Sequence, residues 1–75
     1  MISDHWKNKK VIFKNKTWIL AWYLDRPASI HIENRETGLS DSAIHYSNGR
    51  VGFGRPEMIP NYIKNKVISA FKKRF

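Results

Sequence analysis

Residues 18–24 read WILAWYL and form the longest unbroken apolar run in the chain. A membrane-spanning helix needs about 20 such residues, so this run is too short to cross a bilayer. Aromatic and β-branched residues favour strands, and here apolar side chains fall on both faces. We therefore predict a central strand over residues 17–24, covered by a helix on one face and by something else on the other.

A first strand at residues 11–14 is expected to pair with this central strand. Asn15 and Lys16 would form a two-residue turn between them. That turn places Phe13 directly opposite Trp18, so that the apolar residues of both strands share one face.

After the central strand, residues 25–28 are expected to form a turn, because Pro27 lacks the N–H that a central ladder needs. A third strand is expected at residues 29–34. Alternation in this segment predicts that its isoleucines point inward, whereas His31 and Glu33 point outward.

The dipeptide Asn48-Gly49 separates two alternating segments at residues 42–47 and 50–53. It is the strongest short hairpin signal, because both of its residues tolerate the positive φ of a type I′ turn. The opposite face of the hairpin is then polar and includes His45. The register that follows places four apolar side chains on one face, with Tyr46 opposite Val51 and Ile44 opposite Phe53.

The last segment has helical periodicity. A helix is expected to begin near Pro60, because proline suits a first helical turn, and to run almost to Phe75. Residues 55–59 are expected to form a separate turn. One stripe of the helix should be buried together with the residue before it: Ile59, Ile63, Val67, Ala70 and Phe71. A second stripe should face solvent: Tyr62, Lys66, Ser69 and Lys73.

These elements predict one α+β domain over residues 1–75. We expect a small antiparallel sheet, or an SH3-like partly open barrel, of about five strands packed against one C-terminal helix. In element order and basic charge the chain resembles the small archaeal chromatin proteins, and that resemblance implies the barrel. An open, twisted sheet with the helix across one face fits the pattern equally well. The resemblance transfers no binding residue to this chain.

Size and cysteine content exclude several classes of function. A chain of 75 residues has only a thin core and has no room for a large enzyme with a deep pocket. There is no cysteine, which excludes a disulfide scaffold, a thiolate nucleophile and cysteine-ligated zinc. The segment MISDHWKNKK is too polar for a secretory signal, so we expect a reducing, cytoplasmic setting.

The net charge is +8 and is concentrated in two segments. Residues 1–16 hold five lysines against one aspartate, and residues 61–75 hold five cations and no acid. The part between them has four arginines against five acids. Such an excess keeps a small protein soluble, and it also attracts polyanions such as nucleic acid, an anionic membrane or an acidic protein surface.

If the first strand lies at the edge of the sheet and the helix covers the adjacent face, the two basic segments meet in one cationic surface. We expect this surface to bind nucleic acid or a nucleoprotein mainly through phosphate contacts. Arginines add bidentate contacts, and an exposed tyrosine can stack on an unpaired base. The predicted binding residues are Lys7, Lys9, Lys10, Lys14, Lys16, Arg50, Arg55, Tyr62, Lys66, Lys73 and Arg74.

No enzyme motif is recognisable. His31 with Glu33, and Asp41 with His45, would have to converge across strands to hold zinc or to serve a small hydrolase or nuclease. No nucleophile elbow or phosphate loop is present. We therefore expect no catalytic residue, no metal and no cofactor, and we interpret these histidines as surface residues.

A protein-interaction role is the alternative. A cysteine-free chain of this length, rich in lysine and asparagine, has the style of a phage or mobile-element accessory protein, including inhibitors of host defence such as anti-CRISPR proteins. That role predicts an exposed apolar patch around Tyr46 and Phe53 or at the edge of the second strand. Membrane attachment fits poorly, because the helix needs its apolar side to cover the sheet. A monomer and a homodimer joined through an edge strand both remain open.

Overall fold

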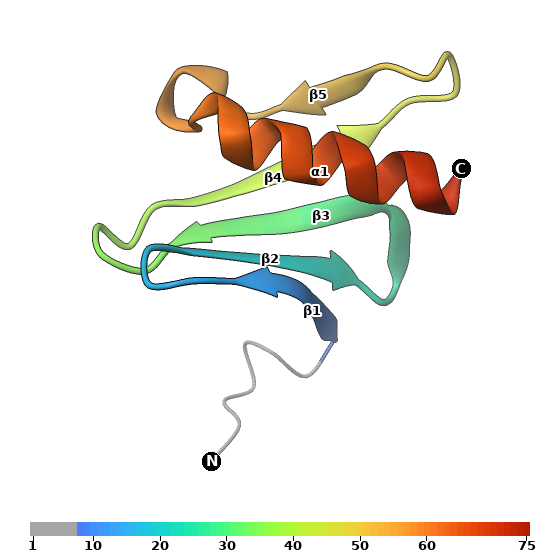
Figure 1. Ribbon diagram of the computed structural model, residues 1–75. Helices are drawn as coiled ribbons and strands as arrows, with labels where there is room; N and C mark the ends of the chain where they lie inside the picture. The colour runs from blue at the N-terminus through green and yellow to red at the C-terminus, as the bar shows by residue number, and fades with distance from the viewer. Residues whose placement is uncertain (1–7) are drawn as a thin grey trace.

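A computed structural model describes residues 8–75, so the prediction for Lys7 lies outside the described part of the chain. Its elements, in order, are β1 (Lys9–Lys14), β2 (Trp18–Tyr23), β3 (Arg26–Asn34), β4 (Ser40–His45), β5 (Val51–Phe53), the 3-10 turn η2 (Pro56–Met58) and α1 (Asn61–Arg74). The five strands pair antiparallel in chain order, and α1 lies across one face of the sheet (Figure 1). The predicted α+β fold is confirmed, in its open-sheet form.

The hydrophobic core lies between the sheet and α1. From β2 it receives Trp18, Leu20 and Trp22, and from β3 it receives Ile30 and Ile32. The predicted buried stripe is confirmed, with Ala70 only partly buried and four residues fully inside: Ile59, Ile63, Val67 and Phe71. Each fully buried side chain of this size contributes about 1.5–3 kcal/mol, which holds the helix on the sheet.

The start of α1 follows from its prolines. The turn η2 occupies the segment between Pro56 and Pro60, as expected. The carbonyl of Pro60 accepts the N–H groups of Ile63 and Lys64, both at 3.1 Å, and so opens the helix. The last turn carries Lys72, Lys73 and Arg74, where cations are favoured by the negative end of the helix dipole.

The turn between β1 and β2 is wider than predicted. The side-chain oxygen of Asn15 accepts the backbone N–H groups of Thr17 and Trp18, at 2.8 and 2.6 Å. Phe13 therefore pairs with Leu20 rather than with Trp18. The register also shifts between Val11 and Phe13, which makes a bulge at the residue between them.

The strand β3 begins earlier than predicted. It starts at Arg26, so Pro27 lies inside the strand rather than in a turn. The pairing with β2 jumps from Trp22–Ile30 to Tyr23–Arg26, and this irregularity passes over the proline. A residue without an N–H is tolerated where the ladder is interrupted in this way.

The register of the hairpin between β4 and β5 is shifted by one residue from the predicted register. Among residues 8–75, positive φ occurs only at glycines, and Gly49 has a φ of 88°. The N–H of Tyr46 donates to the carbonyl of Arg50 at 2.8 Å, and the N–H of Gly49 donates to that of Tyr46 at 2.9 Å. These bonds define a three-residue loop with a glycine bulge, not a type I′ turn.

A one-residue slip exchanges the two faces of a strand. The observed pairs are Ala43 with Phe53, Ile44 with Gly52 and His45 with Val51. Ala43 and His45 therefore face the helix, where the prediction placed Ile44 and Tyr46. Those two side chains instead lie on the outer face, 41% and 51% exposed.

Candidate functional site

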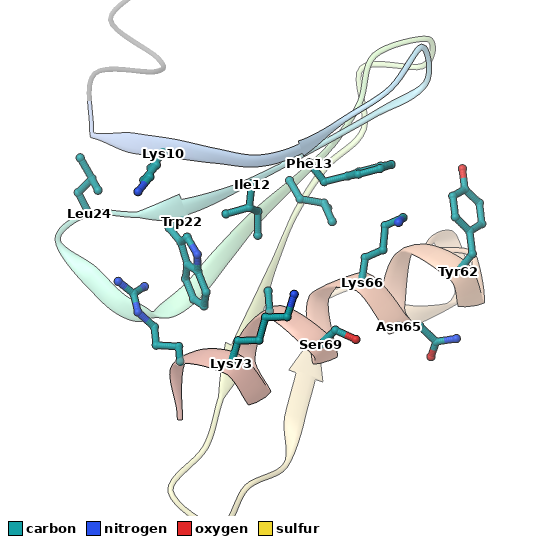
Figure 2. A pocket seen from close by; sticks show the side chains of 13 residues that line it. Lys10, Ile12, Phe13, Trp22, Leu24, Tyr62, Asn65, Lys66, Ser69 and Lys73 are labelled. Atoms are coloured by element: carbon teal, nitrogen blue, oxygen red, sulfur yellow. The ribbon is translucent and has the colours of Figure 1, made fainter.

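An open groove of about 980 Å³ runs between β1 and α1 (Figure 2). It lies where the edge of the sheet extends beyond the helix. Its described lining residues are Lys10, Ile12, Phe13, Leu20, Trp22, Leu24, Tyr62, Asn65, Lys66, Ser69, Ala70, Lys73 and Arg74. We call this surface the β1–α1 groove.

The bulge in β1 shapes one wall of the groove. Val11 is the partner of Ala21, on the face away from the helix, while Ile12 and Phe13 both line the groove. Two apolar side chains in succession thus point toward α1. Because neither is fully buried, they leave an apolar inner surface beside the cations.

Cations from α1 reach across the groove to aromatic rings of the sheet. The ammonium of Lys66 lies 4.4 Å from the ring centroid of Phe13. The guanidinium carbon of Arg74 lies 4.1 Å from the centroid of Trp22. Such cation–π contacts are worth about 0.5–1 kcal/mol at exposed sites. They favour these positions of the two cationic groups by a few-fold over others.

The groove brings together charges from the two basic segments of the sequence. Lys10 comes from the first, and it stands opposite Trp22 on the helix-facing side of β1. Lys66, Lys73 and Arg74 come from the second. Figure 2 shows Lys10 on one wall and the lysines of α1 on the other. No acidic residue is among the described residues that line the groove.

The other predicted binding residues lie elsewhere. Lys9 and Lys14 stand opposite Tyr23 and Ile19, whose side chains are on the face away from the helix, and the Lys9 ammonium lies 5.2 Å from the Tyr23 ring centroid. Lys16 is exposed in the turn after β1. Of the expected cations, the groove therefore contains four, together with Tyr62.

Arg50 and Arg55 flank β5, at the edge of the sheet opposite β1. Arg50 is exposed in the loop before β5. Arg55 follows β5, and its backbone N–H donates to Asp41 at 2.9 Å. Neither lines the β1–α1 groove.

The sequence did not predict the aromatic residues that the cations contact. Phe13 and Trp22 are not among the predicted binding residues, yet both line the groove. The polar residues Asn65 and Ser69 at its rim were also missed as candidates. The signal for Trp22 lies in the register, because the residue opposite it is Lys10 and not an apolar residue.

The outer face of the sheet carries a hydrogen-bonded chain of side chains. Contrary to the prediction, His31 is buried, with 4% of its surface exposed. Its Nδ1 lies 3.2 Å from the Tyr23 hydroxyl, and its Nε2 lies 3.2 Å from Glu33. The Tyr23 hydroxyl is also 3.5 Å from the Ser42 hydroxyl. A cleft of about 530 Å³ adjoins this chain and is lined in part by Tyr46 and Arg55.

The two residue pairs weighed as a metal or catalytic site are separated. His31 contacts Glu33 on the outer face, whereas His45 faces the helix and stacks on Phe75 with ring centroids 4.4 Å apart. Among residues 8–75, no cluster of three histidine or acidic side chains is placed to ligate a metal ion. Within the same residues, no helix combines the length and apolarity needed to span a membrane.

Comparison of the chain with models of protein families, with curated proteins and with solved structures gave no match.

Proposed function

We propose that the protein is a non-enzymatic binding module whose β1–α1 groove engages nucleic acid or a nucleoprotein, mainly through phosphate contacts. One observation carries this proposal: Lys10 lines the same groove as Lys66, Lys73 and Arg74. A concave surface lined by charges of one sign concentrates the opposite charge and accelerates association. Phosphate is the anion that a nucleic acid presents repeatedly at such a surface.

A membrane is a less suitable polyanion for this molecule. An interfacial helix must bury its apolar face in lipid. In α1 that face is already occupied, because Ile63, Val67 and Phe71 are buried against the sheet. The proposal includes a cytoplasmic setting, because a chain without cysteine cannot form the disulfides that stabilise small proteins in oxidising compartments.

The direct test is a binding titration with labelled mixed-sequence nucleic acid, both duplex and single-stranded, at about 50 and 200 mM salt. With four phosphate contacts, log K on duplex DNA should fall with log salt concentration with a slope of about −3.6. Affinity for the duplex should then drop about 150-fold between the two conditions. Undetectable binding of both forms at the lower salt would refute the proposal.

A pair of charge reversals tests the location of the site. Lys66→Glu with Lys73→Glu changes the groove, and Lys14→Glu with Lys16→Glu changes the net charge equally at exposed positions away from it. We expect the first variant to lose at least about tenfold more affinity than the second, because each lost phosphate contact removes a counterion-release term. Equal losses of affinity in the two variants would mean that binding depends on the net charge of the protein and not on the groove.

A protein-docking role is the second candidate, and one observation favours it. Ile44 and Tyr46 are exposed side by side on the outer face, next to the edge strand β5. Exposed apolar and aromatic residues of this kind anchor protein interfaces. The role in question is that of a phage-type accessory protein that inhibits a host defence complex, as anti-CRISPR proteins do.

The two candidates separate in an assay of host-defence inhibition. If the outer face docks a host complex, Tyr46→Asp removes the inhibition, and the double reversal at Lys66 and Lys73 leaves it intact. If the double reversal removes the inhibition and Tyr46→Asp leaves it intact, the inhibitory surface is the groove. Thermal melting of each variant establishes that it is folded.

A further inference from the structure

One aromatic residue of the groove is freely presented to a ligand. Tyr62 is 49% exposed and lies on the same stripe of α1 as Lys66 and Lys73. Figure 2 shows its ring at one end of the groove, beyond Lys66. An exposed aromatic ring beside cations is the combination that single-strand-binding proteins use, because every base has a flat face on which to stack.

The stripe has a length that suits a short strand. At 1.5 Å per helical residue, Tyr62 and Lys73 are separated by about 16 Å along the axis of α1. A stacked strand rises about 3.4 Å per nucleotide, so this distance corresponds to about five nucleotides. The smallest single-strand sites of OB-folds are about four nucleotides long.

The inner surface of the groove is suited to bases rather than to phosphates. Partly exposed apolar residues from β1 and α1 line it, namely Ile12, Phe13 and Ala70, above the buried side chains of Leu20 and Trp22. At the rim, Ser69 offers a neutral donor and acceptor between Lys66 and Lys73, and Asn65 offers another next to Lys66.

A duplex would use only part of this surface. Its bases are stacked inside the helix, and most of what it presents is phosphate and sugar. The cations at the rim would bind it, but the apolar inner surface and the Tyr62 ring would gain nothing. A single strand presents unpaired bases and phosphates together, so it engages the Tyr62 ring and the cations at once.

We infer that the groove binds a single-stranded segment of nucleic acid, with one base stacked on Tyr62 and the adjacent phosphates held by Lys66 and Lys73. This inference rests on the proposed function and specifies its ligand. The recognition is tolerant of sequence, because stacking and phosphate contacts carry little base information. The strand lies along α1, with Lys10 and Arg74 at the end away from the tyrosine.

The test uses the full chain and fluorescence anisotropy with three labelled probes of one mixed sequence: single-stranded DNA, single-stranded RNA and duplex DNA, each about 12 nucleotides long. We expect both single strands to bind at least about tenfold more tightly than the duplex. Their salt slope should be about −2.8, from about −0.7 for each of four phosphate contacts. The DNA and RNA arms show which of the two strands is preferred.

Substitution of the tyrosine tests the stacking contact. Tyr62→Ala should weaken single-strand binding about five- to 150-fold, the range measured for loss of one stacked base. Tyr62→Phe keeps the ring and should retain affinity. Tyr46→Ala, which removes an equally exposed tyrosine from the outer face, is the matched control and should have no effect. Duplex affinity should not change in any of these variants.

The outcomes separate this inference from the proposed function. If the duplex binds as tightly as the single strands, or if Tyr62→Ala has no effect while the reversal at Lys66 and Lys73 does, the single-strand inference is wrong and the phosphate-binding groove stands. If no probe binds at low salt, both are wrong. Circular dichroism of Tyr62→Ala checks that a loss of affinity does not come from unfolding.

Discussion

The central carbon of the Arg74 guanidinium lies over the Trp22 ring, 4.1 Å from its centroid. The same arginine donates from Nη1 to the carbonyl of Pro27 at 3.4 Å. Arg74 thus joins the last turn of α1 to β2 and to the start of β3. One side chain therefore serves both the packing of the helix and the charge of the β1–α1 groove.

We predict that Arg74→Ala lowers the free energy of unfolding by about 0.5–1 kcal/mol, because the indole loses the cation above it. Arg74→Lys should retain more polyanion affinity than Arg74→Ala, since it keeps the charge but not the planar fork. Urea denaturation and anisotropy titrations measure the two effects. Lys72→Ala, at an exposed neighbouring position, is the control, and a stability loss as large there would argue against the contact with Trp22.

We predict that Phe71→Ala costs about 3–5 kcal/mol, enough to unfold most molecules of a domain this small. Phe71 is fully buried and meets the Trp22 ring edge-on, with centroids 5.2 Å apart. Phe75→Ala is the matched control, because that ring is 61% exposed; it stacks on His45 and meets Phe71 at a tilt, with ring centroids 6.3 Å apart. Its cost should be at most about 1.5 kcal/mol. Similar melting temperatures for the two variants would contradict the placement of α1.

The outer face offers a test of cross-strand packing. A Cβ added at Gly52 would lie 2.9 Å from the ring of Tyr46. Because this ring is half exposed and able to swing away, Gly52→Ala should cost only about 0.2–1 kcal/mol, the worth of a cross-strand pair. In a Tyr46→Ala background the same substitution should become neutral or stabilising, since alanine favours a strand more than glycine does. A double-mutant cycle that shows no coupling would be inconsistent with this contact.

The loop before β5 distinguishes the observed turn from the predicted one. Gly49→Ala should cost about 1–2 kcal/mol, because residue 49 has a positive φ. Asn48→Ala should cost less, about 0.5–1 kcal/mol, since it removes only the hydrogen bond that the Asn48 side chain accepts from the N–H of Arg50. Chemical denaturation compares the two. A larger cost at Asn48 than at Gly49 would support a type I′ turn instead.

The helix was predictable because its signal is redundant. Ile63, Val67 and Phe71 repeat at helical spacing, and Pro60 marks the start. The β4–β5 register was not predictable in the same way, because Asn48-Gly49 fits both a two-residue and a three-residue loop. The choice between them depends on what the sheet must bury. Small Ala43 lies fully buried under the helix, where a larger isoleucine was expected.

The candidate site was predictable in its chemistry and only in part in its membership. The charge pattern indicated that β1 and α1 would share a cationic surface, and Lys10, Lys66, Lys73 and Arg74 do line one groove. It did not indicate which lysines of β1 would face the helix. That is decided by the bulge and by the side chain of Asn15, which shift the register of β1 against β2.

The burial of His31 shows the same limit. Simple alternation places it on the face opposite Ile30 and Ile32, which is correct, but alternation does not say whether that face is covered. Its bonds to Tyr23 and Glu33 satisfy the ring in a buried place. Such a network depends on residues from more than one strand, and no local pattern encodes it.

The two walls of the β1–α1 groove are far apart in the sequence: Lys10 lies in the first strand and Lys66 in the last helix. The site therefore exists only while α1 is seated on the sheet. By mass action, any ligand that requires it adds to the free energy of unfolding, by about 2.7 kcal/mol at a concentration one hundred times Kd. For so small a domain that is a large share of the total stability, so the fraction of folded molecules should increase with the concentration of the ligand.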